Sequence, residues 1–224
     1  MKRLLCLMLL IVAVGGFSLM ASKVTFTEFS NIEDELLKLS NKKIKVGVIA
    51  EEDSLLIKYA AANEFGATIT PKKGKYLAIP LQPEFKDKSP RDFPPNFFKL
   101  VPNDPNKPFK SAKLMAGNVE AFLLVKKVVI PERAFMRTAL DNKKNIDKAI
   151  NLARPALERL LMGSGIAEDV CVAIGESIAS SIKANISSNI GPPNSGLTKR
   201  LKGSSKTLID SGDLLKHIGY EIEG

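Results

Sequence analysis

The spacing of apolar side chains predicts three amphipathic helical regions, at residues 24–40, 132–162 and 166–190. Apolar residues recur there every three or four positions, the period of a helix with one buried face. Pro155 is expected to kink or split the second region. The stripe of the second region consists of Phe135, Ala139, Ile146, Ile150, Ala153, Leu157 and Leu160. The clearest stripe, in the third region, consists of Ile166, Val170, Ala173, Ile174, Ile178, Ile182 and Ile186.

Shorter segments near the start of the chain predict a strand and a further helix. Residues 44–50 alternate in polarity and are rich in β-branched side chains, a pattern typical of a strand. Residues 55–64 form a short helix, which Asp53 and Ser54 cap and Gly66 ends. The chain therefore passes from helix to strand and back to helix within its first third.

The next apolar runs predict further strands. Residues 67–70 and 76–81 are interpreted as the two arms of a hairpin around the turn Pro-Lys-Lys-Gly. Residues 119–131 predict one long strand, or a pair of strands with a bend at Lys126 and Lys127.

The end of the chain predicts a short helix at residues 210–217, capped by Asp210 or Ser211, and a last strand at 220–223. The strands thus cluster before the two longest helices, an order typical of an α+β fold and not of a doubly wound sheet. We expect a small antiparallel sheet packed against two or three long helices, in a single domain spanning residues 20–224.

A proline-rich segment interrupts the pattern at residues 82–113. Nine of the 13 prolines lie between Pro71 and Pro108, and each removes a backbone donor and restricts its neighbour. The segment also carries five phenylalanines, Phe85, Phe93, Phe97, Phe98 and Phe109. We interpret it as a long loop that packs on the body of the protein or on a neighbouring subunit.

A second irregular segment, residues 191–206, is rich in glycine, proline, serine and lysine, which predicts a mobile or extended basic arm. It carries Lys199, Arg200, Lys202 and Lys206 and no acid. The arm is either a solvated loop or a contact to a phosphate backbone or an acidic neighbour. It contains no aromatic residue, which argues against stacking on nucleic-acid bases.

The first 19 residues resemble a secretory signal peptide. Lys2 and Arg3 precede an apolar run from Leu4 to Val14, which is short for a bilayer span. Met20 opens a second plausible start, so the alternative is a start site assigned too far upstream. Without Lys2 and Arg3 the net charge falls from +9 to +7, so the chain stays basic in either case.

Composition and motif spacing argue against an enzyme. The two cysteines, Cys6 and Cys171, form no disulfide framework, and Cys171 falls at an apolar helical position, as a buried thiol would. His217 is the only histidine, and its position suits the end of a short helix. The carboxylates of Asp210 and Asp213 are explained by helix capping. We therefore expect no catalytic site, no metal, no cofactor and no small-molecule substrate.

Three stretches of the chain together resemble the tail-completion, or neck, proteins of long-tailed bacteriophages. The first is Tyr59–Gly66, with the strand Tyr76–Pro80 behind it; the second is Ile130–Arg137; the third runs from Gly191 to Leu215 and includes the arm. The resemblance covers most of the chain from about Val24 onward. Two positions depart from it, because family members often have histidine in place of Asn63 and proline in place of Ala134.

The resemblance implies a ring-forming structural subunit at the head–tail junction of a virion, assembled in the host cytoplasm. Its partners would be other copies of itself and other neck and tail proteins, with DNA in the channel as a further candidate. Glu64-Phe65-Gly66 is expected to stop a helix and bury Phe65. The residues expected to serve assembly are Arg133, Phe135, Lys199, Arg200, Lys202, Lys206, Leu208, Asp210 and Leu214. The signal-like leader favours a rival hypothesis, a secreted or periplasmic binding protein.

Overall fold

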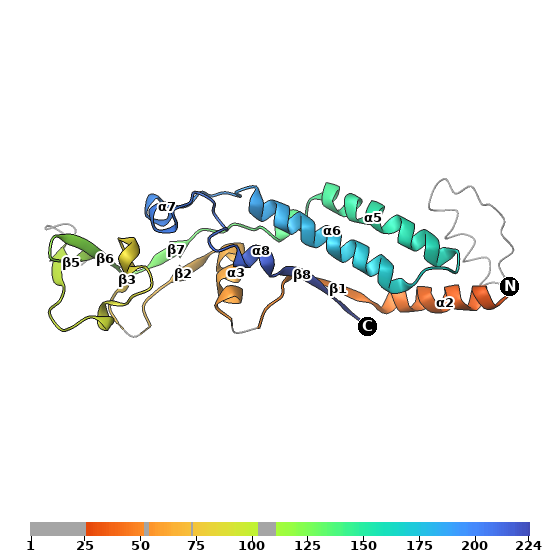
Figure 1. Cartoon of the computed structure of the whole chain (residues 1–224), viewed down its shortest axis with the longest axis horizontal. Coiled ribbons are helices and arrows are strands. Elements are labelled where there is room, and N and C mark those ends of the chain that lie inside the picture. Colours follow the sequence, from red (N-terminus) through yellow and green to blue (C-terminus); the bar gives the residue numbers. More distant parts are fainter. Residues whose placement is uncertain (1–25, 52–53, 73, 103–110) are drawn as a thin grey trace.

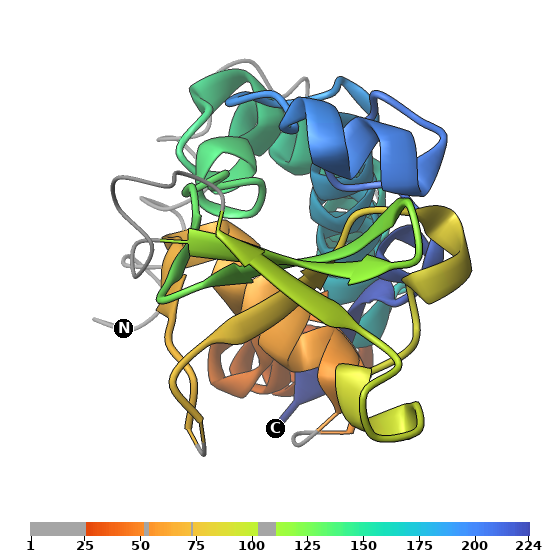
Figure 2. The same cartoon turned by 90° about the vertical axis from the view of Figure 1, so that its left-hand side faces the viewer.

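The computed structural model describes residues 26–51, 54–72, 74–102 and 111–224, and it has the expected α+β fold. The molecule is elongated, with long helices at one end and a four-stranded sheet at the other (Figure 1). We call the helical end the body and residues 77–125, at the sheet end, the β lobe. Seen end-on, the strands of the β lobe cross in front of the body (Figure 2).

The body is built from α2 (Phe26–Asn41), α5 (Lys143–Leu161), α6 (Ala167–Ser187) and the ribbon of β1 (Lys43–Val48) with β8 (Ile218–Glu223). β1 and β8 pair antiparallel, with Val46 opposite Tyr220, so the first and last strands of the described chain form one ribbon. α6 packs between α5 and this ribbon. Gly175 lets α6 approach β8, because an added Cβ would lie 2.5 Å from Cδ2 of Tyr220.

The β lobe is a sheet of β3 (Leu77–Pro80), β6 (Val119–Val125), β5 (Ser111–Ala116) and β4 (Lys99–Pro102), paired in that order. Two 3₁₀ turns, η1 (Pro83–Phe85) and η2 (Pro90–Asp92), lie between β3 and β4. The lobe has an aromatic core in which Phe85 and Phe122 have ring centroids 5.3 Å apart, and Phe93 and Phe98 pack around them. The phenylalanines of the proline-rich segment thus pack on the protein's own sheet; Phe109 lies outside the described residues.

A second ribbon joins the β lobe to the rest of the molecule. β2 (Ala67–Ile69) pairs antiparallel with β7 (Val128–Ile130). Between this connecting ribbon and the body lie α3 (Leu55–Phe65) and α8 (Asp213–Lys216), with α7 (Gly196–Lys202) beside the ribbon. The short helix α4 (Arg137–Leu140) contacts α5 and α6. The helices α3, α4 and α8 share a core with α6 that includes Ala60, Phe135, Ala139, Ile178, Ile182, Leu208, Leu214 and Ile218.

Several predictions about strands were wrong. Residues 67–70 and 76–81 do not pair with each other, because β2 pairs with β7 and β3 with β6. The segment 82–113 is not only loop, since it holds β4 and the start of β5. Of the two possibilities for residues 119–131, the pair of strands is correct, with the break at Lys126 and Lys127.

Corrections also apply to the helices. The region 132–162 becomes helical only at Arg137 and breaks at Asp141, while Pro155 lies inside an unsplit α5. Ile146 and Ile150 are exposed, since α5 buries a stripe of three alanines and one leucine, Ala149, Ala153, Ala156 and Leu160. Within the arm, residues 196–202 form α7. The cap of α8 is Gly212, at a φ of 87°, and neither Asp210 nor Ser211.

Candidate functional site

Arg133 is the centre of a buried junction between three distant parts of the chain. It follows β7, and its guanidinium donates from Nη1 to Oδ1 of Asn63 in α3 at 3.0 Å. Nε donates to the carbonyl of Pro192 at 2.8 Å, and Nη2 to Oδ1 of Asn194 at 3.3 Å. The side chain therefore fastens α3 and the start of the arm to the end of the connecting ribbon.

The acceptors that Arg133 binds are polar but neutral. The residue is 6% exposed, and its guanidinium donates to the backbone carbonyl of Pro192 and to the amide oxygens of Asn63 and Asn194. Burial lowers the pKa of Arg133, yet a guanidinium is so basic that it remains charged at neutral pH. Since a hydrogen bond to a charged group contributes more than a neutral one, the three bonds fix the junction firmly.

Glu64 forms a second buried contact directly beside this one. Its Oε2 accepts from the backbone N–H of Met136 at 2.9 Å, and Oε1 accepts from the N–H of Arg137 at 3.0 Å. Arg137 also pairs with it through Nε at 3.1 Å and donates from Nη2 to Glu132 at 2.6 Å. The carboxylate thus satisfies backbone donors at the start of α4 that the helix itself leaves free.

Phe65 differs from the expectation that it is buried. It is 64% exposed, and the guanidinium carbon of Arg137 lies 5.0 Å from its ring centroid. Gly66 does end α3, at a φ of 72°. The residue that is buried at this helix end is Glu64, because its charge has partners there.

Four of the predicted assembly residues lie inside the molecule. Phe135 is fully buried, and Arg133, Leu208 and Leu214 are nearly so. Phe135, Leu208 and Leu214 pack in one core with α6. Their packing and hydrogen bonds hold the junction together.

The basic residues of the arm lie near the surface, on α7 and after it. Lys199 and Arg200 are exposed, and Nη2 of Arg200 donates to the carbonyl of Leu81 in the β lobe at 3.3 Å. Lys202 is half-buried, and its Nζ donates to the carbonyl of Lys206 at 3.0 Å. Burial lowers the pKa of Lys202. The arm therefore contains a short helix that contacts the β lobe, while its mobility in solution remains a prediction.

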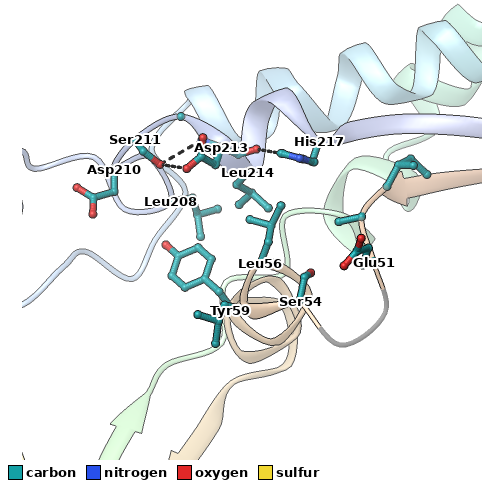
Figure 3. Close-up of a pocket in the computed structure, with 14 residues that line it drawn as sticks. Glu51, Ser54, Leu56, Tyr59, Leu208, Asp210, Ser211, Asp213, Leu214 and His217 are labelled. Atoms are coloured by element: carbon teal, nitrogen blue, oxygen red, sulfur yellow. Dashed lines mark hydrogen bonds between the residues drawn. The ribbon is translucent and has the colours of Figure 1, made fainter. Parts of the chain in front are cut away.

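An open groove of about 760 Å³ lies between α3 and the segment around α8 (Figure 3). Leu56 and Tyr59 of α3 face Leu208 and Leu214 across it, and Asp210, Ser211, Asp213 and His217 lie along one side. Asp210 pairs with Lys86 of the β lobe at 3.4 Å. Sequence reasoning missed this groove, because its two walls are about 150 positions apart in the chain.

The side chains of His217 and Cys171 each have surroundings in the fold that account for them. Nδ1 of His217 lies 2.8 Å from the carbonyl of Asp213. Cys171 is buried, and burial raises the pKa of its thiol. In the described ranges no cluster of three or more histidine, cysteine or acidic side chains could hold a metal ion. Among the same residues, no helix is both long and apolar enough to cross a bilayer.

Comparison with protein-family models, with curated proteins and with solved structures finds no match to this chain.

Proposed function

We propose that this chain is a structural subunit of a bacteriophage or prophage virion, which forms a ring at the head–tail junction as a tail-completion or neck protein. One observation carries the proposal. The three stretches that resemble this family, around Asn63, around Arg133 and after Gly191, meet at the buried side chain of Arg133. Stretches that resemble a family in sequence therefore act together as one physical unit.

The kind of contact at this junction suits a structural role. Arg133 binds neutral oxygens and Glu64 binds backbone N–H groups, so both charges are used to fix the chain. Such a junction sets the positions of body, arm and β lobe relative to one another. Subunits of closed rings need this property, because a head-to-tail interface closes only if the rotation between two patches is well defined.

The proposal names partners and a location. The partners are other copies of this chain and other neck and tail proteins, with no cofactor or small-molecule substrate. The exposed basic residues Lys199 and Arg200 make DNA in the channel a further candidate. Assembly would take place in the host cytoplasm and the product would be part of the virion.

Disruption of the gene tests the proposal. Phage production from a genome lacking the gene should yield filled heads and free tails that are not joined, as counted in electron micrographs. Supplying the wild-type chain from a plasmid should restore joined particles. Normal joined, infectious particles from the disrupted genome would refute the role at the junction.

The leader favours one alternative, a secreted or periplasmic binding protein in which the groove would be the binding site. N-terminal sequencing of the native protein separates the two functions. A first residue at Met20 or Ala21 agrees with assembly in the cytoplasm, whereas cleavage after the apolar run would support export.

A further inference from the structure

We infer that the β lobe turns as a unit against the body about the connecting ribbon, and that two polar contacts hold it in place. These contacts, the ion pair Lys86–Asp210 and the hydrogen bond from Arg200 to Leu81, are called the latch. Such a motion is a property of the subunit whatever it assembles with, so it goes beyond the proposed function. The separate core of the lobe, the gap in the ribbon and the exposed position of the latch support it.

The β lobe has a core of its own at its end of the elongated molecule (Figure 1). The side chains that form this core are Phe85, Phe93, Phe98, Leu114, Ala116, Ala121 and Phe122. In the described ranges, none of them belongs to the two other buried clusters, which join the helices of the body to each other and to α3 and α8. A unit with its own core keeps its internal structure when its position changes.

The strands that lead from the connecting ribbon into the lobe are interrupted at the same level. β2 ends at Ile69, opposite Val128, and β3 begins at Leu77, opposite Val125. On the second chain segment only Lys126 and Lys127 lie between the two pairings, and neither is part of a strand. A gap of this kind suits a hinge, because a few residues between regular elements can absorb a change of backbone angles.

The latch consists of long and exposed contacts. Nζ of Lys86 lies 3.4 Å from Oδ2 of Asp210, and Nη2 of Arg200 donates to the carbonyl of Leu81 at 3.3 Å. The side chains of Lys86 and Asp210 are 41% and 48% exposed. Ion pairs with such exposure contribute little to stability, and salt screens them. The latch is therefore weak enough to open and close while the lobe and the body stay folded.

The segment that carries the body side of the latch is itself fastened. Oδ1 of Asn194 accepts from Arg133, and Nδ2 of Asn194 donates to the carbonyl of Lys206 at 3.0 Å. The backbone N–H of Thr207 donates to Oδ1 of Asn189 at 2.7 Å. The Arg133 junction thus fixes both the base of the connecting ribbon and the segment of the latch. It sets the position of the lobe as long as the latch is closed.

The distance between lobe and body tests the inference in the full-length protein. Spin labels are attached to Asn118→Cys in the lobe and Lys183→Cys on α6, both at exposed positions, and their separation is measured by pulsed electron paramagnetic resonance. Cys6 is replaced by serine, and Cys171 is buried and stays unlabelled. An excess of unlabelled protein removes distances between copies. With the latch closed, at low salt, the wild-type background should give one narrow distance distribution.

Charge reversal opens the latch without touching either core. Lys86→Glu alone and Asp210→Lys alone should each broaden the distance distribution and add longer distances, because like charges then face each other. The combined variant restores the opposite charges and should return the narrow distribution. Lys99→Glu, at another exposed lysine of the lobe, is the matched control and should change nothing. At about 1 M salt, which screens exposed charges beyond roughly 3 Å, the wild-type distribution should broaden as well.

Three results would overturn the inference. A narrow distribution that stays the same in both single variants would show that the lobe is fixed without the latch. A distribution that is already broad in the wild-type background at low salt, or a combined variant no narrower than the single ones, would show that this ion pair does not hold the lobe. Circular dichroism confirms that each variant is folded. The motion of the lobe and the role at the head–tail junction can each fail without the other, since the first is measured on purified protein and the second on particles.

Discussion

At the scale of single residues, Arg133 joins parts of the chain that are 59 to 70 positions apart. Nothing in the sequence marks Arg133 as buried, because arginine is rarely buried. Asparagine, the residue type of its partners Asn63 and Asn194, is also mostly exposed in proteins. The resemblance pointed to the right stretches, but only the folded chain shows that they meet. By contrast, the burial of Cys171 followed directly from its place in an apolar helical pattern.

Arg133→Met should lower the free energy of unfolding by roughly 2–4 kcal/mol, because the buried amide oxygens of Asn63 and Asn194 lose their donor, as does the carbonyl of Pro192. Urea denaturation followed by circular dichroism measures the change. Arg154→Met, at an exposed position of α5, is the control and should change the free energy of unfolding by less than about 0.5 kcal/mol. Equal midpoints for the two variants would mean that the Arg133 junction contributes little to stability.

Phe135→Ala should cost roughly 3 kcal/mol of unfolding free energy, the usual effect of truncating a fully buried phenylalanine. The ring packs in the core shared by α3, α6 and α8, so the loss should also loosen the groove. The same denaturation measurement applies, with Leu37→Ala as an exposed control. A midpoint that does not move would contradict the packing described here.

At the scale of elements, local pattern predicted most helices and strands but not their pairing. The helical period of α6 and the boundary residues of α3, Ser54 and Gly66, are local signals, and the structure confirms them. The exception is Ile166, which precedes α6 and is exposed although it was expected in the apolar stripe. The partners β1 and β8 stand at opposite ends of the chain, so no local signal joins them. α5 is apolar over a wide arc, and periodicity alone could not tell that the alanine half would face α6.

Gly175→Ala probes how closely α6 approaches β8. In the wild-type background the new Cβ would meet the ring of Tyr220, and we expect a loss of about 1–3 kcal/mol of unfolding free energy. In a Tyr220→Ala background the same change should be neutral or stabilise by up to about 1 kcal/mol, since alanine favours helix over glycine. A loss of equal size in both backgrounds would rule out the contact with Tyr220 as its cause.

The arm provides a prediction about local stability. α7 has seven residues and touches the β lobe through Arg200 at 3.3 Å, which is little support for a short helix. Trypsin should therefore cut after Lys199, Arg200 or Lys202 faster in the monomer than in the assembled ring. Lys183, in the middle of α6, is an internal control and should be cut slowly in both. Equal protection of α7 in a verified monomer would contradict this.

At the scale of the whole molecule, body and β lobe are joined by the connecting ribbon and by single contacts from Arg200 and Lys86. The elongated shape separates two ends with different surfaces. The body presents helices at one end, and the β lobe presents a sheet with the exposed edge strand β4 at the other. An extended subunit of this kind can contact more than one neighbour at once. The α+β class followed from the sequence, whereas the division into body and lobe depends on the distant pairing of β2 with β7.

The central claim is that this chain is part of a virion and lies where head meets tail. Purified particles should contain the protein by mass spectrometry, and gold-labelled antibody against it should mark the head–tail junction in electron micrographs. Label along the tail or on the capsid, or particles that are complete and infectious without the protein, would contradict the account.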